Sequence, residues 1–342
     1  MRKPIVLALL LAGACNRGGP GEPAKEVVVY TALDRGFSEP ILDAFTAATG
    51  IRVLAQYDTE ATKSVGLANR IRAEKDRPRC DVFWNNEILN TLQLKSEGLL
   101  ERCDPPQARR YAAAWKDPEG YWYGFAARAR VLIVNTRLVD DPAFPASIRD
   151  LADPRYAGKT GIAKPLFGTT ATHVACLYAA WGPGPTTEYL DALKANRVQV
   201  HGGNKGAAEA VGDGVAAFAL TDTDDAVEEL AARKPVRIVY PDQSEGGSGT
   251  LFLPNVLAVV KGAPHADHAA ALIDYLLSAE VEAQLAAGPS AQIPLGEGVN
   301  PDPRVKGPSQ ARPMAVDFAA AAAAFPAART LVEKRLLNPG GG

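Results

Sequence analysis

The sequence lacks an apolar run long enough to cross a membrane, and it lacks an excess of basic residues. The apolar stretch near the N-terminus, residues 5–12, falls well short of the ~20 residues that a spanning helix needs. Lysine and arginine number 37, two of them within the first three residues, against 39 aspartates and glutamates. Because a nucleic-acid-binding protein is expected to carry a basic face, nucleic acid is excluded as a partner.

Sequence motifs of common enzyme classes are also missing. The chain has no nucleophile elbow of the G-x-S-x-G type, no P-loop and no zinc-binding helix motif. Its one close histidine pair, His265 and His268, opens a predicted helix without a supporting cysteine or glutamate cluster. We interpret these histidines as solvated residues at the helix start. No catalytic residue is predicted, and an exported enzyme is the less favoured alternative.

The first fifteen residues have the pattern of a secretory signal peptide. Arg2 and Lys3 precede the short apolar run, and small residues then lead to Cys15, as in a cleaved leader. A cysteine in this place resembles the lipobox of bacterial lipoproteins, in which the thiol is acylated, although Ala12 stands where Leu, Val or Ile is usual. We predict a signal peptide with lipobox over residues 1–15, lipidation of Cys15 and a flexible tether over residues 16–25. The protein would be periplasmic and membrane-tethered, with an ordinary cleaved signal peptide as the alternative.

Three cysteines follow the leader: Cys80, Cys103 and Cys176. Export to an oxidising compartment permits a disulfide. Cys80 opens a predicted strand and Cys103 follows the next predicted helix, so both would lie at the same end of a sheet. We therefore predict a Cys80–Cys103 bond, with two buried free thiols as the alternative. Cys176 lies in an apolar helical run and is predicted to be part of the core.

β-Branched runs and amphipathic segments alternate along the chain. Strands are predicted at residues 27–30, 51–55, 81–84 and 131–134, and helices at 39–49, 65–74, 90–97, 171–181 and 265–286. This alternation predicts an α/β fold with a parallel sheet covered by helices on both faces, and the 342-residue length predicts two domains. Ligands of such sheets bind beyond the carboxyl ends of the strands. An alanine-rich segment, residues 317–337, is predicted to form closing helices broken near Pro326.

Nine short stretches occur in an order that is typical of one family: residues 29–32, 44–45, 49–53, 81–87, 96–100, 128–131, 145–151, 156–159 and 273–278. Their succession resembles the periplasmic solute-binding proteins of ABC importers, in particular the ferric-iron-binding group of type II periplasmic-binding proteins. The resemblance spans residues 27 to about 295.

This resemblance implies two α/β lobes joined by two β-strand crossovers, near residues 128–134 and 240–255. Lobe I would then comprise residues 26–130 and 255–342, and lobe II residues 131–254. The glycine-rich loop at residues 246–249 is assigned to the hinge, because backbone freedom suits lobe rotation. The resemblance further implies no catalysis, a monomer, a small charged solute held between the lobes, and docking on an ABC permease in the membrane.

Carrying over the metal ligands of the family reveals a departure. In its ferric-binding members adjacent tyrosines grip the metal, whereas the matching residues 221–225 here read Thr221, Asp222, Thr223, Asp224 and Asp225. The histidine and glutamate ligands of the family would fall near Asp34 and at Asn86 or Glu87. Carboxylates at Asp34, Glu60, Glu87, Asp222 and Asp224 supply hard oxygen ligands for a cation. They would equally bind the ammonium group of an organic ligand.

The anion side of such a site is predicted at the start of the helix after residue 167. Gly168, Thr169 and Thr170 would offer free backbone N–H groups, which bind phosphate, carboxylate or carbonate, and a plain threonine cap is the alternative. Arg128 and Arg130 alternate on the crossover strand, where either reaches an anion or forms a salt bridge between lobes. Asn204 and Lys205 begin another predicted helix and are weaker candidates.

Taken together, these features predict an extracytoplasmic receptor that captures ferric iron with a companion anion, or another metal, by hinge closure. The predicted ligand-binding residues are Asp34, Glu60, Trp84, Asn86, Glu87, Arg128, Gly168, Thr169, Thr170, Asn204, Asp222, Thr223 and Asp224, and the predicted metal ligands among them are Asp34, Glu87, Asp222 and Asp224. Trp84 would stack on an organic cation. No covalent cofactor is expected apart from the N-terminal lipid. Binding of an organic zwitterion or phosphonate by the same fold is the alternative.

Overall fold

The computed structural model describes residues 25–58, 65–140, 142 and 144–338. Its first part alternates strands and helices: β1 (Glu26–Thr31), α1 (Arg35–Thr49), β2 (Arg52–Tyr57), α2 (Val65–Ala73), β3 (Val82–Asn85), α3 (Leu89–Ser96) and β4 (Leu100–Glu101). Hydrophobic spacing explains α1, because Ile41, Leu42 and Phe45 are buried on one face. Gly50 ends this helix with a φ of 72°, a conformation that glycine adopts without strain.

The rest of the chain is built in the same way. It contains β5 (Tyr123–Asn135), β6 (Thr160–Ala163), α4 (Gly168–Trp181), α5 (Pro183–Ala195), β7 (Gln199–His201), α6 (Asn204–Gly212), β8 (Phe218–Asp222), α7 (Thr223–Ala231), β9 (Val236–Val239), β10 (Phe252–Val260), α8 (Ala266–Leu276), α9 (Ala279–Ala287) and α10 (Phe318–Val332). Short 3₁₀ helices cover Pro106–Arg110, Ala113–Trp115, Ile148–Ala152 and Pro154–Tyr156, and a π-helix covers Glu333–Leu337.

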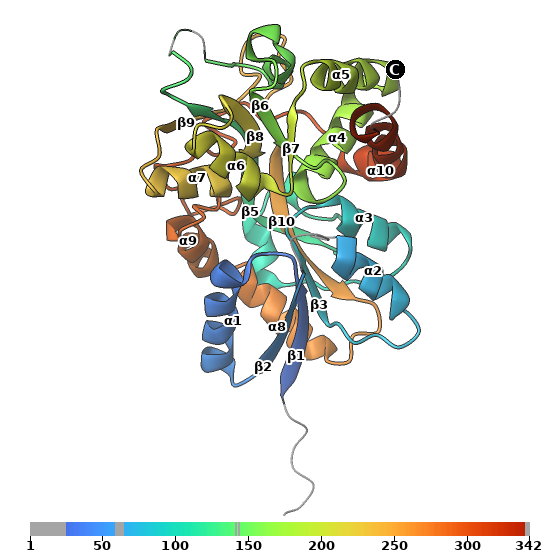
Figure 1. Cartoon of the computed structure of the whole chain (residues 1–342). Coiled ribbons are helices and arrows are strands. Elements are labelled where there is room, and N and C mark those ends of the chain that lie inside the picture. Colours follow the sequence, from blue (N-terminus) through green and yellow to red (C-terminus); the bar gives the residue numbers. More distant parts are fainter. Residues whose placement is uncertain (1–24, 59–64, 141, 143, 339–342) are drawn as a thin grey trace, which may run out of the picture.

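The strands form one long, curled sheet that runs through two lobes (Figure 1). Along the sheet the order is β2-β1-β3-β10-β5-β8-β6-β7, with β4 beside β10 and β9 beside β5. Pairing is parallel among β1, β2 and β3 and among β6, β7 and β8, and antiparallel along β10 and β5. The predicted two-lobed α/β fold with two crossover strands is confirmed.

The long strands β5 and β10 connect the lobes, and both are irregular at the same level. Ala126 in β5 has a φ of 41°, which is strained for a residue with a Cβ, and the register of β10 against β5 shifts between Leu253 and Asn255. The Asn255 side chain donates to the Ala126 carbonyl, and buried Glu282 accepts the Ala126 N–H at 3.1 Å. Side-chain hydrogen bonds thus stabilise this irregular part of β5 and β10 between the lobes.

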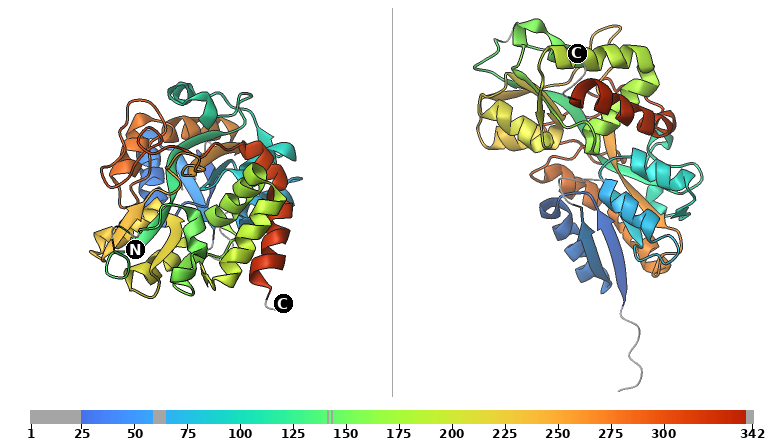
Figure 2. Two further views of the ribbon diagram at one scale, coloured as in Figure 1. Left: turned by 90° about the horizontal axis from the view of Figure 1, so that it is seen from above. Right: turned by 45° about the vertical axis from the view of Figure 1, so that its right-hand side comes forward.

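The C-terminal helix α10 lies across the boundary between the lobes. It packs against α4 and α5 of the upper lobe in Figure 1 and also against α3 of the lower lobe, and Figure 2 shows it beside these helices in a second view. The division into residues 26–130 with 255–342 and residues 131–254 stays a prediction. Because α10 contacts both lobes, its contacts do not assign the C-terminal segment to lobe I.

Two local predictions need correction. Residues 265–286 form two helices instead of one, because the Ser278 hydroxyl accepts the N–H of Val281 and starts α9. Helix α10 runs through Pro326 without the expected break.

The hinge role of the glycine-rich loop stays a prediction. The loop is closely packed at Gly249, where a Cβ would lie 2.6 Å from the Pro313 carbonyl oxygen, so glycine permits a close approach here.

The sheet separates two hydrophobic clusters, and this explains the cysteines. Tyr30 and Val29 point to opposite faces, as neighbours in a strand do, and belong to different clusters. Cys80 lies in the Tyr30 cluster, while Cys103 packs against the Val29 cluster. The predicted Cys80–Cys103 bond is therefore wrong, and both are free thiols. Cys176 is buried in the core as predicted.

The predicted leader lies almost wholly outside the described residues. These begin at residue 25, so the signal peptide, Cys15 and all but the last residue of the tether are not described. Within the described ranges, no helix combines the length and the apolar character needed to cross a membrane.

Candidate functional site

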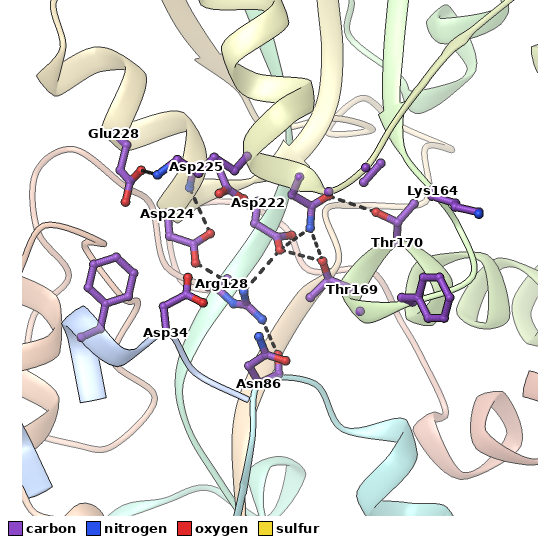
Figure 3. Close-up of a pocket in the computed structure, with 18 residues that line it drawn as sticks. Asp34, Asn86, Arg128, Lys164, Thr169, Thr170, Asp222, Asp224, Asp225 and Glu228 are labelled. Carbon is purple, nitrogen blue, oxygen red and sulfur yellow. Dashed lines mark hydrogen bonds and ion pairs between the residues drawn. The ribbon is translucent and has the colours of Figure 1, made fainter. Parts of the chain in front are cut away.

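A polar pocket of about 80 Å³ lies between the lobes. This is several times the ~10–15 Å³ that one water molecule needs, which leaves room for an ion with a small anion. Asp34, Phe37 and Asn86 line it from the lower lobe, and Arg128 lines it from β5. The polar lining from the upper lobe comprises Lys164, Thr169, Thr170, Asn204, Lys205, Asp222, Asp224, Asp225 and Glu228 (Figure 3).

Asp222, which lines the pocket, forms an ion pair with Arg130. Both residues are 0% exposed, and the Nη1 of Arg130 lies 2.7 Å from Oδ1 of Asp222. Burial alone would raise the pKa of Asp222, but the guanidinium groups of Arg130 and then Arg128 outweigh it and hold this pKa below its ordinary value. Asp222 is thus ionised at neutral pH.

The side chains around this ion pair are engaged with it. Thr169 donates its hydroxyl to Asp222 at 2.6 Å, and Thr170 accepts from Nη2 of Arg130 at 3.0 Å. The amide of Asn204 donates to Asp222 at 3.0 Å and accepts from Arg130 at 3.0 Å. These contacts fix the first turns of α4 and α6. The side chains of these turns are engaged with the ion pair, so the groups left to bind a ligand are mainly backbone N–H groups.

Two helix N-termini face the pocket from the same side. Helix α4 begins at Gly168 and α6 at Asn204, and the first N–H groups of a helix have no partner within it. Together with the positive end of the helix dipole they attract anions. Lys164 lies beside them, while the ammonium of Lys205 is paired with Glu228 at 3.2 Å. This side can bind a small anion.

A group of carboxylates forms the other side. One oxygen each of Asp222, Asp224 and Asp225 lies within 4.8 Å of the others, a spacing that a single cation can bridge. Asp224 and Asp225 are in the first turn of α7, directly after β8 ends at Asp222. Asp34 approaches this group from the lower lobe (Figure 3). Oxygen ligands of this kind suit hard cations.

Arg128 lies between the lobes and contacts both. Its Nη1 lies 3.3 Å from Oδ2 of Asp224 and 3.4 Å from Oδ2 of Asp222, and its Nη2 donates to the backbone carbonyl of Asn86. Burial lowers the pKa of Arg128, but Asp224 and then Asp222 raise it by more, so the net shift is upward. Arg128 thus connects the two lobes, through ion pairs with the upper lobe and a hydrogen bond to the lower lobe.

The pocket brings together many of the residues predicted to bind ligand. Asp34, Asn86, Arg128, Gly168, Thr169, Thr170, Asn204, Asp222 and Asp224 all line it. Glu60 lies outside the described residues. Thr223 is buried, and its hydroxyl accepts the N–H of Ala129 at 3.1 Å, so it fixes α7 to β5 instead of facing the pocket.

Trp84 and Glu87 lie away from the pocket. Trp84 is fully buried and packs on Phe125 with ring centroids 5.5 Å apart, because its side chain points to the sheet face opposite that of Phe83. Glu87 is 0% exposed and accepts the N–H groups of Leu89 at 2.7 Å and Asn90 at 3.1 Å at the start of α3. A stacking role for Trp84 and a metal-ligand role for Glu87 do not fit these positions.

Sequence reasoning missed several lining residues as site candidates: Phe37, Lys164, Phe167, Asp225 and Glu228. Asp225 follows Asp224 in the same predicted strand-to-helix turn, so the turn itself was a signal for it. Glu228 comes one helical turn after Asp224 and shares its face. Phe37 and Phe167 are uncharged, so no pattern of charged residues points to them. They line the pocket only because the two lobes pack together.

His173 lies under the pocket and gives a pH prediction. It is buried in α4, and burial, followed by the nearby Arg130, lowers its pKa from 6.5 to about 3. The unfolded chain therefore takes up this proton below pH 6.5 while the folded protein does not, so stability falls as pH falls. Between pH 6.5 and 4.5 we expect wild type to lose about 2 kcal/mol more unfolding free energy than His173→Gln.

Urea unfolding at a series of pH values measures this difference. His201→Gln is the matched control, since His201 is only partly buried and its pKa is lowered by burial alone. An identical pH slope in wild type and His173→Gln would show that the pKa of His173 is the same in the folded and the unfolded chain.

The chain is similar to several known proteins. A family profile described as bacterial extracellular solute-binding protein matches residues 90–323. The chain is 27% identical over 278 residues to Iron uptake protein A1 of Synechocystis sp., covering 78% of this chain and 75% of that protein. It is 26% identical over 299 residues to the Major ferric iron-binding protein of Neisseria meningitidis, covering 85% and 86%. The structure superposes on iron-bound HitA from Pseudomonas aeruginosa with a TM-score of 0.80 at 25% identity, over 89% of this chain and 98% of that one.

Proposed function

The chain belongs to the bacterial extracellular solute-binding proteins, whose profile matches more than half of it, and we propose that it captures ferric iron with a small anion for an ABC importer. The observation that carries this proposal is the two-sided pocket between the lobes. Asp222, Asp224 and Asp225 bring three carboxylate oxygens within 4.8 Å of one another, and the N-termini of α4 and α6 face them. A high-charge cation held with a companion anion matches both sides.

The relatives support a metal as the solute. Two similar proteins carry iron in their names, and a third was crystallised with iron bound. Among the described residues no tyrosine lines the pocket, so iron would be held by carboxylate oxygens. Asp224, Asp225 and Asp34 are the proposed ligands, because Asp222 is already paired with Arg130. Hard trivalent cations accept such oxygen ligands.

Capture would work through the relative position of the two lobes. Asp34 and Asn86 line the pocket from one lobe, and Asp224 and the α4 N-terminus line it from the other. A solute that contacts both lobes favours the closed arrangement, since it gains contacts only there. The protein acts by binding rather than by catalysis, and its closed form docks on the permease as a monomer.

A small organic zwitterion, including an amino-phosphonate, is the second candidate. Lys164 beside two helix N-termini favours an anionic group, and the carboxylates would hold an ammonium. The tether is part of the proposal as well. Acylation of Cys15 would keep the receptor at the membrane surface, because the acyl groups are buried in the bilayer.

The test removes two carboxylates that face the pocket. We expect ferric citrate to raise the melting temperature of the wild-type protein, and the double variant Asp224→Asn with Asp225→Asn to bind it at least about 100-fold more weakly, because two anionic ligands are lost. Isothermal titration and thermal unfolding measure both. Asp267→Asn, an exposed change on α8, is the control.

Two outcomes would contradict the proposal. Unchanged ferric citrate affinity in the double variant would remove these carboxylates from the site. Stabilisation of wild type by 2-aminoethylphosphonate without citrate or iron, together with no response to ferric citrate, would favour the zwitterion instead.

A further inference from the structure

We propose that Arg128 is the built-in counter-ion of the carboxylate group, and that a multivalent cation binds by displacing its guanidinium. This inference rests on the proposed function and deepens it, because it names a residue that sets which cations bind. It starts from the place of Arg128 in the pocket: Figure 3 shows its guanidinium directly below Asp222 and Asp224 and above Asn86.

Arg128 contacts an oxygen of Asp224, which is a proposed metal ligand, and an oxygen of Asp222 next to it. Its Nη1 lies 3.3 Å from Oδ2 of Asp224 and 3.4 Å from Oδ2 of Asp222. The side chain is 4% exposed, so this pairing takes place in a nearly dry environment, where opposite charges attract most strongly. The guanidinium therefore occupies the position that a bound cation would take beside these carboxylates.

Arg128 is held less completely than its neighbour Arg130. Arg130 contacts Asp222, Thr169, Thr170 and Asn204 through hydrogen bonds of 2.7–3.2 Å, all within the upper lobe. The contacts of Arg128 to the carboxylates are longer, 3.3 and 3.4 Å, and its remaining contact is with the Asn86 carbonyl of the lower lobe. Arg130 is thus fixed within the upper lobe, and Arg128 is the side chain that can leave.

Displacement would be linked to lobe movement. The Nη2 of Arg128 donates to the backbone carbonyl of Asn86 in the lower lobe, while Nη1 contacts α7 and the end of β8 in the upper lobe. When the guanidinium leaves, this bridge is lost and the incoming cation replaces it through Asp224 and Asp34.

The exchange explains a charge preference. A monovalent ammonium gains from the carboxylates about what Arg128 already gains, so replacing the guanidinium brings little. A trivalent cation interacts about three times as strongly with the same oxygens at equal distance, since Coulomb energy is proportional to charge. Arg128 would therefore exclude weakly charged cations and admit only those of high charge.

The test compares Arg128 variants with terbium(III), a hard trivalent cation followed by its luminescence. Arg128→Gln and the apolar Arg128→Met remove the competing charge and are expected to bind terbium(III) at least about 10-fold more tightly than wild type. Arg128→Lys keeps a charge and should bind like wild type. Arg52→Gln, which breaks an exposed ion pair with Glu26, is the control.

Thermal unfolding distinguishes this effect from misfolding. Without terbium(III), Arg128→Gln should melt below wild type, because buried carboxylates lose a partner, and saturating terbium(III) should restore the melting temperature. Equal or weaker terbium(III) binding in a folded Arg128→Gln variant overturns the inference, as does an absence of binding by every variant.

The outcomes for the two proposals can be separated. If wild type binds ferric citrate and the Arg128 variants bind terbium(III) no more tightly, the counter-ion role is wrong and the iron-receptor function stands. If wild type shows no response to ferric citrate while Arg128→Gln gains terbium(III) affinity, the counter-ion role stands and the iron-receptor function is wrong.

Discussion

Replacing Asp222 with asparagine is expected to lower the free energy of unfolding by about 3–5 kcal/mol, the cost of breaking a buried ion pair from one side. Asp222 faces two buried guanidinium groups, with Arg130 at 2.7 Å and Arg128 at 3.4 Å. An amide has no charge to balance them, and its NH₂ group would face the donors Thr169 and Asn204. Urea unfolding at neutral pH measures the loss.

An exposed ion pair provides the comparison. Asp191 pairs with Arg335 on the surface, where both side chains are more than 40% exposed, so Asp191→Asn should change the unfolding free energy by less than about 1 kcal/mol. A loss of the same small size for Asp222→Asn would mean that water reaches Arg130 when the carboxylate is removed. Circular dichroism checks that the variant keeps its secondary structure.

The strand pattern and the family resemblance together predicted about half of the residues that line the pocket. Asp34, Asn86 and Asp222 were expected beyond the ends of strands, and β1, β3 and β8 end just before or at these residues. Because parallel strands bring their carboxyl ends to one edge, local sequence determines which residues gather there. The resemblance to the ferric-iron-binding group, read from short stretches, is confirmed by the family profile and the similar proteins.

What the sequence left open depends on contacts between distant residues. Trp84 was expected in the pocket, but the alternation of side chains in β3 turns it toward Phe125. The cysteine pair failed for a related reason, since the two thiols lie on opposite faces of the sheet. A shift of one residue along a strand moves each side chain to the opposite face of the sheet. The sequence of a short strand does not define its first and last residues to within one residue.

The roles of charged residues were the least predictable part. Arg128 and Arg130 alternate in sequence and looked equivalent, yet one is enclosed by four side chains and the other bridges the lobes. The difference comes from α4 and α6, which surround Arg130 from far along the chain. Charge pairing inside the pocket therefore required the three-dimensional structure.

The second prediction with a large expected effect concerns Glu87. Its carboxylate oxygens accept the N–H groups of Leu89 and Asn90, the side chains of Asn85 and Asn90, and the hydroxyl of Thr172 at 3.0 Å. This last bond joins α3 of one lobe to α4 of the other. Glu87→Gln replaces one accepting oxygen by a donor, so we expect about 3 kcal/mol lower unfolding free energy, as for lost hydrogen bonds to a buried charge.

The contact with Thr172 makes this change more than a loss of stability. Thr172→Val removes only the bond between the lobes and should cost about 1 kcal/mol. The double variant should lose less than the sum of the two single losses, because both remove the same contact. Glu97→Gln, at the far end of the same helix and paired with Arg72 on the surface, is the control. Additive losses in the cycle, measured by urea unfolding, would mean that Glu87 supports α3 alone and that the lobes are joined here by packing instead.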